Sequence, residues 1–200
     1  MTQNAIPLFT KRRTQYALGA KLPLPEAQVD ALIREAIRLS PSSFNSQSSR
    51  ALILFGAPSQ KLWKEITKET LRPMVPADAF AATDAKMDAF AAGAGTVLFY
   101  EDQDVIKDLQ QKYPLYADNF PVFSEHSAGM AQFAVWTALA EAGIGASLQH
   151  YAPLIDAEVA KTWGVPASWK LRAQMPFGSN EAPLPEKTFI ADDVRFKTVR

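Results

Sequence analysis

The spacing of apolar residues along the chain predicts amphipathic helices alternating with short buried strands. Between Glu26 and Leu39 apolar residues recur at i, i+3, i+4, i+7 and i+8, which places them on one helical face, and Pro41 follows as a stop signal. The same reasoning predicts helices over residues 58–72, 77–92 and 153–163, and a helix that Asp102 caps. Short apolar or alternating runs predict strands over residues 51–55, 95–100, 169–176 and 194–199.

The longest apolar stretch runs from Ala128 to Leu148 and predicts a helix, over residues 124–142, that is buried on nearly all sides. Gln132 and Glu141 lie within this stretch, whereas a membrane-spanning helix of that length would be almost free of such residues. A helix buried on every side needs a partner beyond its own sheet. Either a second copy of the chain, as in a two-fold dimer, or other helices of the same protomer would supply it.

Composition and charge place the chain among ordinary globular proteins. The length of 200 residues fits one domain over residues 1–200, and the 48% apolar and 21% charged residues exclude a disordered or fibrous chain. With 21 basic and 21 acidic residues the net charge is zero, which makes nucleic acid and anionic membranes poor partners. The N-terminal basic cluster follows a short apolar stretch, the reverse of a signal peptide, so we expect a cytoplasmic protein.

Most chemistries that rely on protein side chains are missing from the sequence. Cysteine is absent, which excludes disulfides, thiol nucleophiles and Cys-ligated metals. No P-loop, dinucleotide fingerprint, G-x-S-x-G or H-E-x-x-H motif occurs, and the two histidines, His126 and His150, form no metal or triad constellation. We therefore predict no metal site and no catalytic side chain. If the protein is an enzyme, a cofactor carries the reaction.

Three polar clusters lie where predicted elements end. Lys11–Tyr16 contains two adjacent arginines and a threonine, which suit a phosphate dianion, although a solvated basic patch has the same composition. Ser42–Gln47 offers hydroxyl and amide groups to the edge of a planar heterocycle, or simply connects a helix to a strand. Gly143–Tyr151 leaves the apolar helix with small residues that let a ligand approach the backbone closely. Lys187, in the last loop, is a further cation.

Taken in order, these clusters resemble the FMN-dependent nitroreductase family. The sequence carries R-R-T-x-Y-x-L near the N-terminus, S-P-S-S-F-N-S-Q-S-S-R after the first amphipathic helix, G-I-G-A-S after the apolar helix, and a late P-x-K-T-F. Their order and spacing are most similar to those of a small subgroup found in bacteria and fungi. The resemblance implies an α+β fold, with a mixed β-sheet flanked by helices in an α-β-α sandwich. It also implies an intertwined homodimer with FMN at the interface.

The resemblance further implies which residues hold the cofactor. The FMN phosphate would be bound by Arg12, Arg13, Thr14 and Lys187, and Tyr16 would lie close to the ring. The ring edge would meet a loop of the partner subunit through Pro41, Ser42, Ser43, Asn45 and Gln47. The other side of the ring would be lined by Ser147, Leu148, Gln149 and His150.

Two positions depart from the family pattern. Ser48-Ser49-Arg50 stands where many relatives carry a tryptophan, and Phe189 stands where many carry an arginine. Larger relatives carry an Asn or Lys near the pyrimidine edge, from the helix after the first strand, and Arg72 is the candidate for that place here.

By this resemblance the protein would be an NAD(P)H oxidoreductase that reduces nitroaromatic or quinone acceptors. Hydride would pass from NADH or NADPH to flavin N5 and then to a small aromatic acceptor in the same slot, which gives ping-pong kinetics. The alternative is a non-enzymatic flavin-binding sensor, or a dimeric regulatory module built on the same fold.

Overall fold

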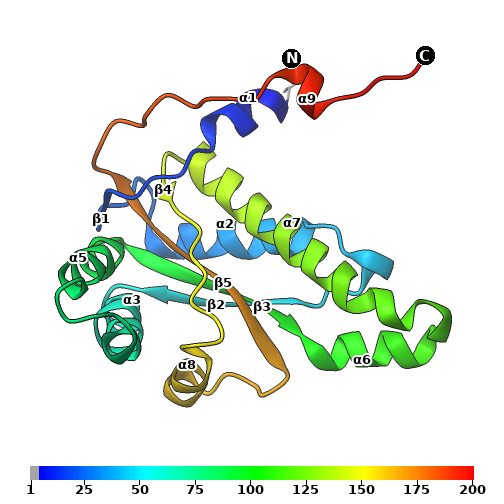
Figure 1. The fold of residues 1–200 in the computed structure, drawn as a ribbon, viewed down its shortest axis with the longest axis horizontal. Helices are drawn as coiled ribbons and strands as arrows, with labels where there is room; N and C mark the ends of the chain where they lie inside the picture. The colour runs from blue at the N-terminus through cyan, green and yellow to red at the C-terminus, as the bar shows by residue number, and fades with distance from the viewer. Residues whose placement is uncertain (1–4) are drawn as a thin grey trace.

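A computed structural model describes residues 5–200 and arranges them as a five-stranded sheet with helices on both faces (Figure 1). The strands are β1 (Leu18–Gly19), β2 (Ser49–Phe55), β3 (Gly95–Asp102), β4 (Gly145–Ala146) and β5 (Trp169–Asn180). Their order is β1-β5-β3-β2, with β4 also paired to β5, and these pairs are antiparallel. A parallel bridge joins Thr14 to Ala146. The predicted α+β class is confirmed.

The helical segments are of three types: α, π and 3₁₀. The α-helices are α1 (Ala5–Lys11), α2 (Glu26–Leu39), α3 (Ala57–Lys61), α4 (Lys68–Leu71), α5 (Phe80–Ala91), α6 (Gln103–Lys112), α7 (Phe120–Glu141), α8 (Asp156–Trp163) and α9 (Asp192–Arg195). A π-helical segment, η2 (Leu62–Thr67), joins α3 to α4, and 3₁₀ turns lie at η1 (Ser43–Asn45), η3 (Arg72–Met74) and η4 (Pro114–Asn119). In the described part of the chain, no helix is both long and apolar enough to cross a membrane.

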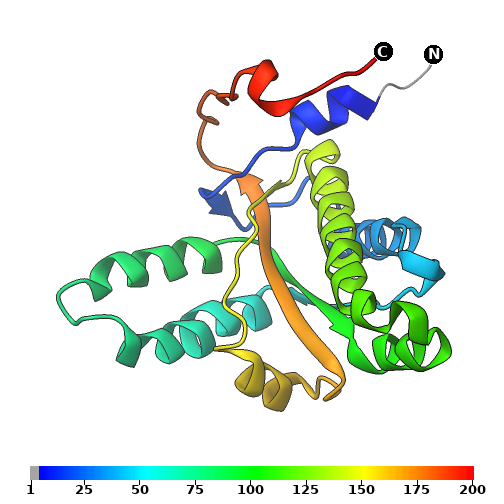
Figure 2. The same cartoon turned by 45° about the vertical axis from the view of Figure 1, so that its right-hand side comes forward.

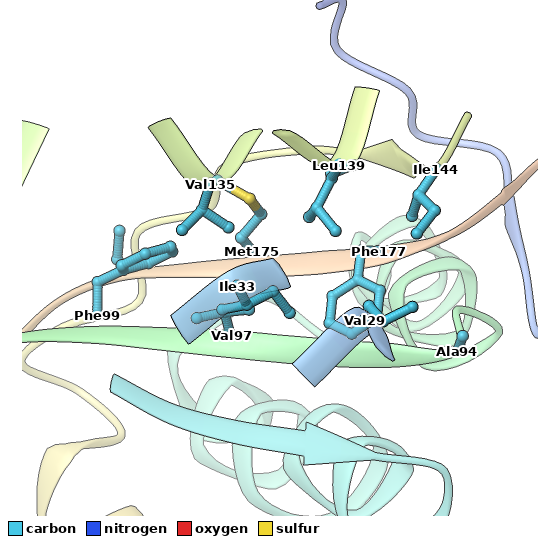
Figure 3. Packing of buried hydrophobic residues seen from close by; sticks show 12 residues of the cluster. Val29, Ile33, Ala94, Val97, Phe99, Val135, Leu139, Ile144, Met175 and Phe177 are labelled. Carbon is cyan, nitrogen blue, oxygen red and sulfur yellow. The ribbon is translucent and has the colours of Figure 1, made fainter. Parts of the chain in front are cut away.

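Each face of the sheet carries its own hydrophobic core, because successive side chains of a strand point to opposite faces. On one face Val97 and Phe99 of β3 pack against helices α2 and α7, together with Met175 and Phe177 of β5 (Figure 3). On the other face, Leu98 and the other alternate residues of β3 pack against η2, α5 and α8. The uniformly apolar sequence of β3 follows from this burial on both sides.

Helix α7 is buried on one side only within the protomer. Val135 and Leu139 face the sheet and α2, whereas Met130 and Phe133 remain 37% and 42% exposed. Phe133 also contacts Phe9 of α1, with ring centroids 5.3 Å apart. The predicted helix over residues 124–142 is present, but the protomer buries one face of it and leaves an apolar face with Met130 and Phe133 partly exposed, rather than burying it on nearly all sides.

The predicted helices and strands are present, some with shifted bounds, except near the C-terminus. Helix α2 has the predicted bounds, and the Asp102 carboxylate accepts a hydrogen bond from Asp104 N–H at the start of α6. The strand predicted over residues 194–199 is wrong: Asp192–Arg195 form the short helix α9, and the remaining residues pair with no described strand. The strand predicted over residues 169–176 is longer in the structure, because β5 continues to Asn180.

Residues 181–200, here called the C-terminal arm, are exposed throughout. The arm passes α1 and ends beyond it, away from the sheet (Figures 1 and 2). It carries large apolar side chains in the open, with Phe189, Val194 and Phe196 at 70%, 75% and 62% exposure. These apolar side chains therefore gain little burial from the described protomer.

Gly178 of β5 lies where three backbone segments converge, so we expect Gly178→Ala to destabilise the fold. An added methyl group would lie 2.0 Å from the Gly19 carbonyl oxygen and 3.0 Å from the Ala94 nitrogen. Overpacking of this kind costs about 1–3 kcal/mol or more, which lowers the melting temperature of a chain this size by roughly 3–10 °C. Thermal melts should show this loss, and Ser179→Ala, one residue along the strand, should melt near wild type. Equal melting of both variants would contradict the close approach.

Candidate functional site

The first predicted cluster follows directly from α1 and lies against the end of α7 and β4. Thr14 forms the bridge with Ala146, and the Gln15 N–H donates to the Ala146 carbonyl oxygen at 2.9 Å. The Arg13 guanidinium donates to the Pro185 carbonyl oxygen at 2.6 Å, which brings the arm segment containing Lys187 to the same end of the molecule. Residues far apart in sequence therefore converge here, as the predicted phosphate site requires.

The electrostatics of this cluster favour an anion. The Arg12 guanidinium lies 4.5 Å from the centre of the Trp136 ring. Partial burial, and after it the charge of Arg13, lower the pKa of Arg12. Both effects disfavour the positive charge, and a bound phosphate dianion would offset them with charge-assisted hydrogen bonds. A cavity of about 330 Å³ opens beside Arg13 and is bounded by Lys11 and Asn180.

The segment from Ser147 to His150 runs beside β5 and presents backbone to the open side. The N–H groups of Ser147 and Gln149 donate to β5 carbonyl oxygens at 3.2 and 2.7 Å. Because N–H groups alternate in direction along an extended segment, those of Leu148 and His150 point away from β5. The side chain of Gln149 donates to the Ser147 hydroxyl at 3.1 Å, so these two side chains are turned inward and buried. Backbone donors, rather than these side chains, are available to a ring.

The predicted loop over Pro41–Gln47 holds an unusual backbone conformation. Phe44, Asn45 and Gln47 have φ angles of 57°, 49° and 50°, in the left-handed region. Each left-handed residue that is not glycine costs roughly 1–2 kcal/mol, and such strain is typical of functional segments. The side chains of Asn45 and Gln47 are exposed. The loop thus exposes its amide side chains. Its strained backbone conformation has to be stabilised by contacts with the surrounding structure.

Hydrogen bonds and aromatic contacts fix this loop on the first half of α7. The Ser42 carbonyl accepts from the Asn45 N–H at 3.0 Å, and the Ser42 hydroxyl accepts from the Gln47 N–H at 2.9 Å. The Ser43 N–H donates to the Ser127 hydroxyl of α7 at 3.4 Å. Phe44 packs its ring on three aromatic neighbours, Tyr113, Tyr116 and Phe120.

Within one protomer, the Pro41–Gln47 loop lies far from the basic cluster, Lys11–Tyr16. Ser127 touches the loop, whereas Glu141, at the other end of α7, is bonded by Lys11 beside the basic cluster. At the helical rise these two positions on α7 lie about 20 Å apart. Among residues 5–200, no hydrogen bond, ion pair or ring contact joins Pro41–Gln47 to residues 12–16 or 147–150. We expect this separation if the loop that meets a flavin ring comes from the partner subunit.

Two further predicted residues stand apart from these contacts. Tyr16 is 59% exposed and follows the buried Gln15. Arg72 donates to Glu69 through Nε and Nη2, both at 2.9 Å, and stacks on Phe80, between the end of α4 and the start of α5. The pairing gives Arg72 a structural partner at that position, so its role at the pyrimidine edge has no support in the geometry.

A large apolar hollow lies on the described surface, apart from the three polar clusters. It has a volume of about 960 Å³ and lies between α1, α2 and α7. We call it the α7 groove; its walls include Phe9, Leu39, Met130 and Phe133. Of the predicted cofactor ligands, Pro41 alone lines it among the described residues. Its size and apolar walls suit packed protein side chains better than a phosphate-bearing ligand.

Sequence reasoning missed three groups that shape the site. Trp136 holds the Arg12 side chain and donates its own N–H to the Ala146 carbonyl oxygen at 3.2 Å. Glu101 is fully buried next to the loop, and Arg50 bonds the Gln47 carbonyl. The only sequence signal for Glu101 and Arg50 was the Ser48-Ser49-Arg50 departure from the family pattern.

Comparison with known proteins places this chain in a family. The sequence profile described as "Nitroreductase family" matches residues 9–179. The chain belongs to the nitroreductase family. A putative nitroreductase of Saccharomyces cerevisiae, HBN1, is 38% identical to this nitroreductase over 188 residues, which cover 93% of each protein.

Solved structures support the same assignment. The nitroreductase CinD from Lactococcus lactis, in complex with chloramphenicol, is 51% identical with a TM-score of 0.91, over 98% of this chain and 100% of that chain. CinD has also been solved in complex with 4-nitrophenol. A nitroreductase with bound FMN from Desulfitobacterium hafniense shares the fold at 15% identity and a TM-score of 0.72, over the full length of both chains. FMN is the cofactor of this family.

Proposed function

We propose that this nitroreductase is an FMN-dependent NAD(P)H oxidoreductase that reduces nitroaromatic or quinone acceptors as a homodimer. The observation that carries the proposal is the convergence of Arg12, Arg13 and Thr14 with the backbone after Ala146. The arm segment that contains Lys187 joins them through the Arg13 bond to Pro185. Cations, a hydroxyl and outward-pointing N–H groups fit the phosphate and ring of FMN.

The homodimer is supported by three features of the protomer. The α7 groove is apolar and open, and its wall residues Met130 and Phe133 are partly exposed. The C-terminal arm carries large apolar side chains that stay mostly exposed in the described protomer. The loop and the basic cluster lie at opposite ends of α7, so two copies are needed to place both on one flavin. A second copy that crosses at α7 would satisfy all three.

The chain's own residues would bind and orient the cofactor and its substrates. FMN, when bound, would supply the redox chemistry, which is hydride transfer from NADH or NADPH to a nitro group or a quinone. Arg12 and its neighbours anchor the phosphate. The N–H groups of Leu148 and His150 would donate to the ring, and the partner subunit's Asn45 would bind its polar edge. Fixed donors near the ring stabilise negative charge that develops there.

The acceptor class draws support from the relative at 51% identity. CinD has been crystallised with chloramphenicol and with 4-nitrophenol, which are aromatic molecules. The exposed rings of Phe44, Tyr16 and Tyr116 offer flat apolar surfaces near the predicted ring-binding segments. Small aromatic acceptors can stack on such surfaces.

The proposal is tested by the colour of the protein and its response to nicotinamide. Purified protein, or protein mixed with FMN, should show the absorption bands of oxidised flavin. These bands should bleach under anaerobic NADH or NADPH and return when 4-nitrophenol or a quinone is added. A yellow protein that never bleaches would favour the flavin-binding sensor, and a protein without FMN affinity would reject both functions.

A further inference from the structure

The buried carboxylate of Glu101 is surrounded by serine hydroxyls rather than by a cation. Glu101, on β3, has no exposed surface. Its Oε2 atom accepts hydrogen bonds from Ser48 at 2.5 Å and from Ser124 at 2.9 Å, and its Oε1 atom accepts one from Ser49 at 2.5 Å. A buried carboxylate needs such donors, since its desolvation is otherwise unfavourable. Both oxygens are therefore committed to specific neighbours.

Through Glu101, these three serines connect the end of the Pro41–Gln47 loop to helix α7. Ser48 and Ser49 follow Gln47 directly in the sequence, so they mark the C-terminal end of the loop. Ser124 lies on α7, one turn before Ser127, whose hydroxyl accepts from the loop. Glu101 thus joins the end of the loop to the same helix that holds its beginning.

Arg50 makes a second connection at the same end of the loop. Its Nη1 atom donates to the Gln47 carbonyl at 2.6 Å, and its Nη2 atom donates to the Asp102 carboxylate at 3.0 Å. The other oxygen of that carboxylate accepts from the Asp104 N–H and so caps α6. The carbonyl of the left-handed Gln47 is thereby fixed to the start of a helix.

We infer that Glu101 and Arg50 are positioning residues, which hold the strained loop in the conformation that meets the flavin ring. The inference rests on the proposed function, because it takes the loop to be a ring ligand. Neither residue lies in the basic cluster, so phosphate binding should not depend on them. Their loss should let the left-handed residues relax, and the groups aimed at the ring would move.

The test uses the full-length protein with two kinds of substitution. Glu101→Gln keeps the size of the side chain but puts an N–H₂ group where one oxygen accepts from serine. Arg50→Ala removes both donors of a partly exposed side chain, and Arg50→Lys restores one charge. Glu65→Gln, at an exposed carboxylate paired with Lys61, is the matched control.

The first readout is hydrogen exchange in the flavin-free protein, followed by mass spectrometry of peptides from residues 41–50. In Glu101→Gln and Arg50→Ala we expect exchange of the loop amides to rise about tenfold, while β3 peptides and the control stay at wild-type values. Unchanged loop exchange in both variants would overturn the holding role. Arg50→Ala keeps this test valid if Glu101→Gln fails to fold, because Arg50 is not in a core.

The second readout separates positioning from cofactor affinity. With FMN bound, we expect anaerobic bleaching by the nicotinamide donor to slow roughly tenfold to a hundredfold in both variants, with partial recovery in Arg50→Lys. The FMN dissociation constant should stay within about threefold of wild type, since the phosphate anchor is intact. If hydrogen exchange of the loop rises in the variants but the rate of flavin bleaching is unchanged, Glu101 and Arg50 do not position the loop for the ring. Absence of bleaching in wild type would instead reject the proposed function, and the exchange result would still decide the holding role.

Discussion

Phe133→Asp is expected to give a folded monomer that has lost its flavin. Phe133 lies in the wall of the α7 groove and is 42% exposed in the protomer, so a carboxylate there can reach water in an isolated chain. At the proposed interface the same carboxylate would be buried without a partner, at a cost of several kcal/mol. Sedimentation or light scattering should report the monomer, and the absorption spectrum should show no bound FMN.

Leu154→Asp is the matched control for this experiment. Leu154 has nearly the same exposure, 44%, but precedes α8 and does not line the α7 groove. It should remain dimeric and yellow. A Phe133→Asp protein that stays dimeric with full flavin content would show that the α7 groove is not the interface.

Arg12→Ala should weaken FMN binding by roughly tenfold to a hundredfold. The guanidinium provides charge-assisted hydrogen bonds, worth about 1.5–3 kcal/mol, to a phosphate dianion. Titration of flavin fluorescence in phosphate-free buffer measures the change. Arg12→Lys should lie in between, because an ammonium keeps the charge but lacks the planar fork and its stacking on Trp136.

Riboflavin provides the internal control for the Arg12 variants. It carries the same ring without the phosphate, so its affinity should be nearly equal in wild type and Arg12→Ala. Equal losses for riboflavin and FMN would mean that Arg12 supports the fold or the ring but does not bind the phosphate.

Periodicity predicted the regular helices and buried strands well because their burial follows from local spacing. Helix α2 matches its predicted bounds, and β3 is buried on both faces as its apolar run requires. Helix α7 begins at Phe120 rather than at residue 124, with Pro121 in its first turn, where proline is favourable. The predicted helix over residues 58–72 contains the π-helical segment η2, which local spacing does not reveal.

The predictions that were wrong or missing concern features that depend on contacts between distant parts of the chain. A strand at residues 194–199 would need a neighbouring strand, and the C-terminal arm has none within the described protomer. Likewise, the pairing of Thr14 with Ala146 joins distant segments and could be expected only through the family resemblance. Glu101 was overlooked because acidic residues are seldom fully buried, and the serines that permit its burial resemble ordinary loop residues.

Strand β5 makes completion of the sheet a late event during synthesis. It pairs with β1, β3 and β4, and it is the last of the described strands to be synthesised. Until it emerges, β3 has β2 on one side and an open, strongly apolar edge on the other. Folding therefore waits on long-range pairing, which is slow and leaves the nascent chain prone to aggregation. We expect overproduction of this protein to benefit from slow translation and low temperature, which give β5 time to cover that edge.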